Sequence, residues 1–222
     1  MLKKLSEEKL EEILETGISQ FAEFGLQQTS MNVIAKQARI SVGVLYKYYE
    51  NKNAFYDACV ERCTSELDQF LLQLCAQKRK PLDYARELID AIQQFSDRHK
   101  DHVRLYHQAT QTGDPVRAAK LAHRIEGIRS ELYAKIISQA QESGDVRSDL
   151  DPQLFAFFFD NLLITMEFSY CCPYYQERLK LYAAKQSSDN FHIANQLLKF
   201  MESAFTLEQS DIPHRDTKGE IV

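Results

Sequence analysis

Residues 29–52 read TSMNVIAKQARISVGVLYKYYENK, and this stretch decides the fold. Thr29 or Ser30 can cap one helix by offering a hydroxyl oxygen to the free amides of its first turn, and Ser41 can cap another in the same way. The first of these helices is predicted to end near Ala38. The stretch is therefore predicted to form two short helices joined by a tight turn.

Apolar spacing assigns a buried side to each of the two helices. Val33, Ile34 and Ala38 share one face of the first, and Leu45 and Tyr49 lie four residues apart in the second. The residues of the second helix that are left to face outward, wholly or in part, are Val42, Gly43, Val44, Tyr46, Lys47 and Tyr48.

The outward face is suited to a phosphate backbone. Gly43 lowers helix stability by about 1 kcal/mol relative to alanine, which makes sense where another backbone must come close. Tyrosine hydroxyls and lysines are common phosphate contacts. Residues 29–52 contain four cationic side chains and one acidic side chain, Glu50, a local charge of +3, whereas the whole chain carries −5. The predicted function of this stretch is to read DNA.

The order of residues resembles the helix-turn-helix of TetR-family transcriptional regulators. The matching residues are Thr29, Ser30, Ile34, Ala35, Ala38, Ile40, Ser41, Gly43, Val44, Leu45, Tyr46, Tyr49 and Lys52. Three residues depart from the family pattern: Arg39 replaces the turn glycine, Val44 a common threonine, and Tyr48 a frequent histidine. Arg39 is expected to strain the turn if its backbone is left-handed.

The resemblance implies a set of DNA contacts. Lys47 is the expected base contact, Val44 is expected to touch a thymine methyl group, and Ser30 or Asn32 adds a further contact. The remaining members are expected to position the phosphate strand, and they are Thr29, Ser41, Val42, Gly43, Tyr46, Tyr48 and Lys52.

Composition describes a globular chain with a substantial core, since 44% of its 222 residues are apolar. The chain has no run of about 18 uninterrupted apolar residues, and its acidic N-terminus argues against a signal peptide, so a cytoplasmic protein without a membrane is expected. Its negative total argues against indiscriminate coating of nucleic acid. Five cysteines without metal-finger spacing are expected to be reduced thiols.

Helical signals continue along the whole chain and predict an all-α fold. Capping and glycine signals place a first helix from Ser6 to Gly25, and a long connecting helix is expected over about 52–79. Proline starts indicate further helices after Pro81, Pro115 and Pro152, and a last one near the C-terminus. The expected domains are a three-helix DNA-binding head at 1–52, a larger ligand-binding and dimerisation domain at 53–207, and a flexible tail at 208–222. The segment from Tyr170 to Tyr182 is predicted to be a connection.

The helix after Pro152 has apolar residues around nearly its whole circumference, so it is not a simple surface helix. One side can face its own domain and a second copy of the chain can cover the other, with the last helix completing a four-helix interface. The expected interface residues are Phe155, Phe159, Met166, Leu197, Met201 and Phe205.

A small-molecule effector, mostly apolar or aromatic, is expected in the larger domain. The predicted pocket residues are Tyr106, His107, His123, Tyr133, Phe158, Asn161, Leu162 and Thr165. A hydrogen-bonded core histidine is the alternative for His123. His99, His102 and His107 lack a convincing third ligand, so no metal and no cofactor are expected. Cys171 and Cys172 remain candidate oxidant sensors if they are exposed.

The function expected from the resemblance is a homodimeric repressor that binds double-stranded operator DNA and is released by the effector. The long connecting helix would act as a lever between effector and head. Two alternatives stay open: a helical dimer whose head binds protein, and an all-α enzyme that uses one of the histidines. The enzyme is disfavoured because no acid, base and nucleophile assemble at a recognisable spacing.

Overall fold

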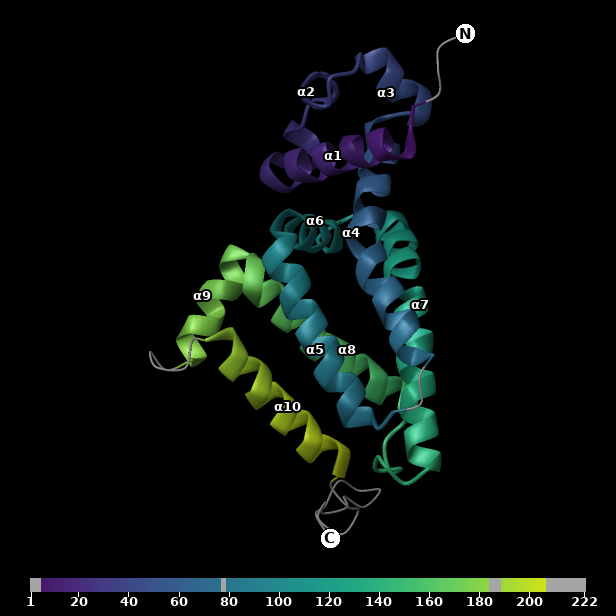
Figure 1. The fold of residues 1–222 in the computed structure, drawn as a ribbon, viewed down its shortest axis with the longest axis vertical. Helices are drawn as coiled ribbons and strands as arrows, with labels where there is room; N and C mark the ends of the chain where they lie inside the picture. Colours follow the sequence, from purple (N-terminus) through teal and green to yellow (C-terminus); the bar gives the residue numbers. More distant parts are fainter. Residues whose placement is uncertain (1–4, 77–78, 184–188, 207–222) are drawn as a thin grey trace.

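The computed structural model describes residues 5–76, 79–183 and 189–206. Within these ranges the chain is helical and contains no strand, as Figure 1 shows. The helices are α1 (Glu7–Gln28), α2 (Met31–Gln37), α3 (Val42–Tyr48), α4 (Lys52–Cys75), α5 (Pro81–Arg98), α6 (Lys100–Thr110), α7 (Pro115–Glu142), α8 (Pro152–Cys171), α9 (Pro173–Tyr182) and α10 (Asn190–Thr206).

Helices α1, α2 and α3 form the head at one end of the molecule, and the start of α4 completes it (Figure 1). Ser6 caps α1, and Gly25 breaks its helical geometry with φ 73°, a value that disfavours side chains. Gly17 brings α1 and α4 together, since a Cβ at Gly17 would lie 2.5 Å from the Phe55 ring. The predicted start of this helix at Ser6 is therefore confirmed, whereas Gly25 kinks the helix and does not end it, because α1 continues to Gln28.

The buried side of α2 differs from the predicted one. Val33 is 43% exposed, whereas Met31 and Ala35 are buried beside the predicted Ile34 and Ala38. The helix is short and its first turn packs over α1, so the buried face begins at Met31 and not at Val33. In α3, Leu45 is buried as predicted and Tyr49 is half-buried against Phe55, with ring centroids 4.7 Å apart.

Helix α4 joins the head to the larger body but is shorter than predicted, because it ends at Cys75 and not near residue 79. Its first turns bury Phe55 and Tyr56 in the head, and its later turns bury Leu67 and Leu71 in the body. At about 1.5 Å per residue its 24 residues span roughly 36 Å, so one rigid element reaches both domains.

Helices α4 and α7 run parallel and are joined by three ion pairs. Arg117 pairs with Asp57 at 2.7 Å, Arg124 pairs with Glu61, and Arg129 pairs with Asp68 at 2.7 Å. The Arg117 guanidinium also lies 5.1 Å from the centre of the Tyr56 ring. These pairs fix the register of the connecting helix against the body.

The segment from Tyr170 to Tyr182, predicted to be a connection, is mostly the helix α9, which packs against α8. Pro173 suits the first turn of a helix, and the Tyr175 ring lies 5.4 Å from that of Phe168. By length and apolar composition α8 could cross a membrane, but half of it is buried inside the protein. The predicted tail at 208–222 lies outside the described residues.

Candidate DNA-binding head and ligand pocket

Helix α3 presents its polar side chains to solvent. Tyr46 and Lys47 are exposed, while Val42, Val44 and Tyr48 are half-buried. Ser41 caps the helix by accepting a hydrogen bond from the amide of Val44 at 3.3 Å, as predicted. Leu45 anchors the helix in the head core, and the half-buried Val42 packs against the same core, so the opposite face is free for a partner.

The fold of the head does not require a glycine at position 43. Its φ lies outside the left-handed region, and a Cβ there would meet only the Ser41 Oγ, 3.9 Å away. The missing side chain therefore leaves room outside the head, where a second backbone can approach.

The turn between α2 and α3 holds Arg39 in a left-handed conformation with φ 55°. The amide of Ile40 donates to the carbonyl of Ala35 at 2.9 Å, and the amide of Arg39 donates to that of Lys36 at 3.1 Å. This pair of bonds is the helix-ending motif that normally uses glycine at the left-handed position. The predicted strain at Arg39 is therefore present, and its side chain is exposed.

Three predicted phosphate contacts, Thr29, Lys52 and Tyr48, form hydrogen bonds inside the head. Thr29 is buried, and its hydroxyl lies within hydrogen-bond distance of the carbonyls of Gln20 and Gly25, so the prediction that it faces DNA is wrong. The Lys52 ammonium donates to the carbonyls of Gln27 and Thr29 at 3.0 and 3.1 Å and thereby caps the end of α1.

Tyr48 holds the start of the chain, because its hydroxyl accepts a hydrogen bond from the amide of Leu5 at 2.7 Å. Ser30 and Asn32 are exposed on α2, and Ser30 makes no side-chain capping bond. The surface that remains for DNA is defined here as the reading surface: Ser30, Asn32, Ser41, Gly43, Val44, Tyr46 and Lys47.

A pocket of about 610 Å³ lies in the body between α6, α7 and α8. Four aromatic residues line it: Tyr106, Tyr133, Phe157 and Phe168. Its volume falls within the usual range of small-molecule sites, about 300–1,000 Å³. We call this cavity the α6–α8 pocket.

Three of the eight predicted pocket residues line this cavity. Tyr106, Tyr133 and Asn161 line the α6–α8 pocket, whereas His107, His123, Phe158, Leu162 and Thr165 do not. His123 is exposed on α7, on the face opposite Leu121 and Ile125. Phe158 is 58% exposed on a different side of α8 from the pocket residues.

A cluster of buried charges adjoins this pocket and was not predicted. Arg129 is 5% exposed and lies near Asp68, Glu126, Asp160 and Glu167. Burial raises the pKa of Asp160 to about 7, and Arg129 opposes this effect. Burial likewise raises the pKa of Glu167 to about 7. The sequence held a signal, since Arg129 lies on the stripe formed by Ile125, Tyr133 and Ile137.

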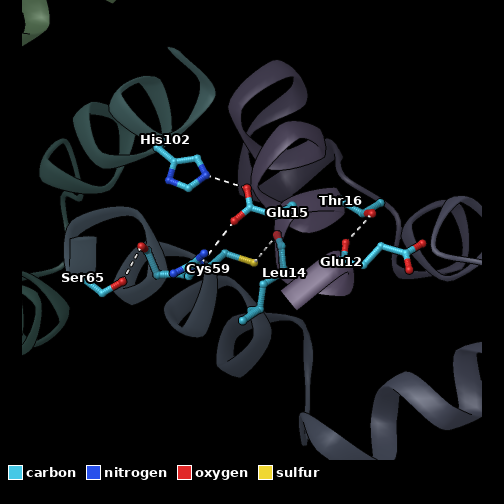
Figure 2. Close-up of polar contacts among 8 residues, drawn as sticks. Glu12, Leu14, Glu15, Thr16, Cys59, Ser65 and His102 are labelled. Atoms are coloured by element: carbon cyan, nitrogen blue, oxygen red, sulfur yellow. Dashed lines mark hydrogen bonds and ion pairs between the residues drawn. The ribbon is translucent and has the colours of Figure 1, made fainter. Parts of the chain in front are cut away.

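Helix α6 connects the pocket to the head. Tyr106 on α6 donates to Glu126 at 2.5 Å on the pocket side. Toward the head, His102 Nε2 lies 2.6 Å from Glu15 Oε2, and the side-chain amide of Gln108 donates to the backbone carbonyl of Ala22 at 2.8 Å. Figure 2 shows His102 and Glu15 facing each other across the two helices.

Glu15 is also held from α4, because Arg62 Nε lies 3.3 Å from its other oxygen. The hydrogen bond from His102 lowers the pKa of Glu15, and Arg62 lowers it further. Sequence reasoning assigned the link between the domains to α4 alone. The contact from α6 joins residues 87 positions apart, so no local sequence pattern predicts it.

The predicted dimer residues lie in the core of their own protomer. Phe155, Phe159, Met166, Met201 and Phe205 are each at most 9% exposed, and Leu197 is half-buried. The Phe155 and Phe205 rings pack 5.5 Å apart, because the C-terminal end of α10 meets the start of α8. The five buried residues are therefore unsuitable as interface contacts.

Other candidate chemistry is not favoured by the geometry. Cys171 and Cys172 are buried, and burial raises their pKa to about 11 and about 12, so both thiols are protonated and shielded. In the described part of the chain, no group of three or more His, Cys, Asp or Glu residues is placed to hold a metal ion.

Comparisons with known proteins agree with this arrangement. Residues 13–59 match the family described as bacterial regulatory proteins, tetR family, and this match covers the head and the start of α4. The chain is 25% identical over 154 residues to a probable acrEF/envCD operon repressor of Escherichia coli (strain K12), covering 68% of this chain and 70% of that protein.

Two solved structures share the fold. The fatty acid degradation regulator FadR of Bacillus halodurans has a TM-score of 0.74 at 13% identity, covering 89% of this chain and all of that one. FadR of Thermus thermophilus, a TetR family repressor in complex with lauroyl-CoA, has a TM-score of 0.61 at 21% identity, covering 92% and 98%. The family match of the head and the related repressor support a transcriptional regulator of the TetR family, and the solved structures show that the all-α body shares their fold.

Proposed function

We propose that the chain is a cytoplasmic, homodimeric transcriptional repressor that leaves its operator when a small organic molecule fills the α6–α8 pocket. The observation that carries this proposal is the reading surface, which has exposed polar groups and an unfilled space at Gly43 that the head itself does not need. A related protein that is named a repressor supports the direction of regulation. The proposal assigns no catalytic step to the chain.

Base reading is assigned to Lys47 and Val44. The Lys47 ammonium has no hydrogen-bond partner among the described residues and extends from the exposed face of α3, so it can reach a base edge or a phosphate. The half-buried Val44 beside it presents methyl groups suited to a thymine methyl. Ser30, Asn32, Ser41 and Tyr46 supply groups for the phosphate strand.

The proposed homodimer is supported by the apolar residues that α8 and α10 leave uncovered. Leu154 and Phe158 lie four residues apart on α8 and are each 58% exposed, and Phe200 on α10 is 59% exposed. A second copy related by a two-fold axis would cover these side chains and would place two heads on one duplex. Two heads are needed because a single small basic surface binds weakly.

Effector release is assigned to movement of α6. Occupation of the pocket would press on Tyr106, which shares α6 with His102 and Gln108, the residues that hold α1. A shift of α6 would therefore change the orientation of the head, and two heads would no longer fit half-sites spaced by one helical turn of DNA.

The test begins with selection of bound DNA from a genomic pool of the source organism. Lys47→Ala is expected to weaken binding to the selected DNA by about 1–3 kcal/mol without loss of helical content. Lys120→Ala on the exposed face of α7 is the matched control. A folded dimer that retains no DNA in the selection would overturn the proposal and favour a head that binds protein.

The dimer is tested by sedimentation of the wild-type protein and of Phe158→Glu. The variant is expected to be monomeric, whereas Tyr182→Glu, at an exposed position on α9, is expected to stay dimeric. A wild-type monomer at micromolar concentration would refute the assigned interface.

A further inference from the structure

The α6–α8 pocket is acidic and has no basic lining. Glu126, Glu131 and Asp160 contribute carboxyl groups, and among the described residues that line the cavity there is no lysine, arginine or histidine. The walls are aromatic, and the remaining polar groups are neutral. A pocket of this composition attracts positive charge and repels negative charge.

One carboxylate oxygen of Glu126, a residue that lines this pocket, lacks a hydrogen-bond partner. Glu126 Oε1 accepts the hydroxyl proton of Tyr106, but Oε2 is buried and has no hydrogen bond. The nearest cation is the Arg129 Nη1, 4.0 Å away, too far for a hydrogen bond. A buried acceptor of this kind is costly unless a ligand satisfies it.

Arg129 cannot neutralise the cluster by itself. Its Nε is engaged by Asp68 on α4, and it faces three further carboxyl groups, those of Glu126, Asp160 and Glu167. One guanidinium is therefore shared among four carboxyl groups, and the side of the cluster that faces the pocket has more acidic groups than basic ones.

We propose that the α6–α8 pocket binds an organic cation with an aromatic or apolar body, an amine or quaternary ammonium whose charge lies between Glu126 and Asp160. The body of such a ligand packs against the aromatic lining, in which Phe157 is the most exposed ring, and aromatic faces favour cations. This inference rests on the proposed function, because it names the effector class of the same site.

The raised pKa of Asp160 agrees with the same arrangement. Burial disfavours its carboxylate, and the nearby Glu126 disfavours it further. A cation in the pocket would supply the opposite charge that the ionised form lacks. The phosphates of an acyl-CoA would meet the same carboxyl groups with repulsion.

The experiment compares two planar tricyclic probes of similar size and opposite charge, N-methylacridinium and anthracene-9-carboxylate, by titration against the wild-type dimer. The cation is expected to bind at least about tenfold more tightly. Glu126→Gln keeps an acceptor for Tyr106 and is expected to weaken cation binding by about tenfold, the factor for one lost charged contact, while the carboxylate is unaffected or gains. Glu142→Gln, exposed in the last turn of α7, is the matched control.

Thermal unfolding of each variant establishes that the body is folded, and Asp160→Asn repeats the test from α8. Equal affinity for the two probes, tighter binding of the carboxylate, or cation binding insensitive to both substitutions would overturn the inference. Displacement of N-methylacridinium by lauroyl-CoA at comparable concentration would also overturn it, by assigning the pocket to an anionic ligand.

DNA binding is measured separately on the selected operator, so the two proposals fail independently. A protein that binds the cation through Glu126 but retains no DNA would refute the repressor and leave the ligand class standing. A protein that binds operator but not the cation would refute the ligand class alone.

Discussion

Replacing Glu167 by glutamine should stabilise this protein, and by an amount that depends on pH. Glu167 lies in α8, 3% exposed, and faces Arg129, Glu126, Asp160 and Asp68. Burial raises its pKa from an ordinary 4.5 to about 7, and the neighbouring acids add to this effect while Arg129 opposes it. In the unfolded chain the same carboxyl group titrates at its ordinary value.

The sign follows from which state binds more protons. Between pH 4.5 and 7 the folded protein keeps a proton on Glu167 that the unfolded chain has lost, so stability falls as pH rises through this range. At about 1.4 kcal/mol per pKa unit, the raised pKa of Glu167 destabilises the fold by about 3 kcal/mol at pH 8, where the folded carboxyl group is ionised, and by about 1 kcal/mol at pH 5.5, where it keeps its proton. Glutamine has nearly the same shape and does not ionise.

The assay is urea unfolding of wild type and Glu167→Gln at pH 5.5 and pH 8, at one fixed protomer concentration because the proposed dimerisation would contribute to stability. The expected gain is about 3 kcal/mol at pH 8 and about 1 kcal/mol at pH 5.5. Glu142→Gln on the surface should change stability by less than about 0.5 kcal/mol at either pH. A gain in stability that is equal at both pH values, or a loss at pH 8, would show that burial does not raise the pKa of Glu167.

Three glycine-related substitutions test the head and its attachment. Gly43→Ala should raise helix stability by up to about 1 kcal/mol because nothing inside the head meets the new methyl group, yet it should weaken binding to selected DNA in a filter or fluorescence assay. Gly17→Ala should destabilise by about 1–3 kcal/mol in urea unfolding, because its Cβ would overlap the Phe55 ring. Arg39→Gly should stabilise by about 0.5–1 kcal/mol in the same measurement, by relieving the left-handed strain at φ 55°.

Each of these substitutions has an outcome against it. Unchanged DNA affinity in Gly43→Ala would remove the close approach of a phosphate backbone from the account of the head. Gly127→Ala is the control for Gly17, since no atom lies within 4 Å of a Cβ at Gly127, and equal effects at both sites would refute the α1–α4 contact. A loss of stability in Arg39→Gly would mean that the Arg39 side chain stabilises the turn by more than its backbone strain.

The amino-acid sequence by itself determined the class of the fold and the identity of the head. Helix starts at Asp114 and Asp151 and the stop at Gly144 depend on local capping and backbone preference, and all three are present. The turn at Arg39 could be placed from the same local rules. Ser41, Gly43 and Lys47 could be assigned to an outward face because helical spacing fixes which side Leu45 buries.

Only the tertiary structure decided which polar groups are free for a partner. Thr29 and Lys52 were predicted to touch phosphate. The buried Thr29 hydroxyl and the Lys52 ammonium instead donate hydrogen bonds to carbonyls of α1 that lie up to 25 residues away. The apolar residues of α8 pointed to an interface, yet spacing alone could not tell the side that α5 and α7 cover from the side left open at Leu154 and Phe158.

The ligand site was beyond reach for the same reason. Glu126, Asp160 and Tyr106 come from three helices. The sequence of one helix therefore predicts neither that they lie close together nor that one oxygen of Glu126 lacks a hydrogen bond. The contact of His102 with Glu15 likewise joins distant turns. Helix formation is a local property of the chain, whereas the environment of a charge depends on every helix packed around it, and that environment sets what the pocket and the head can bind.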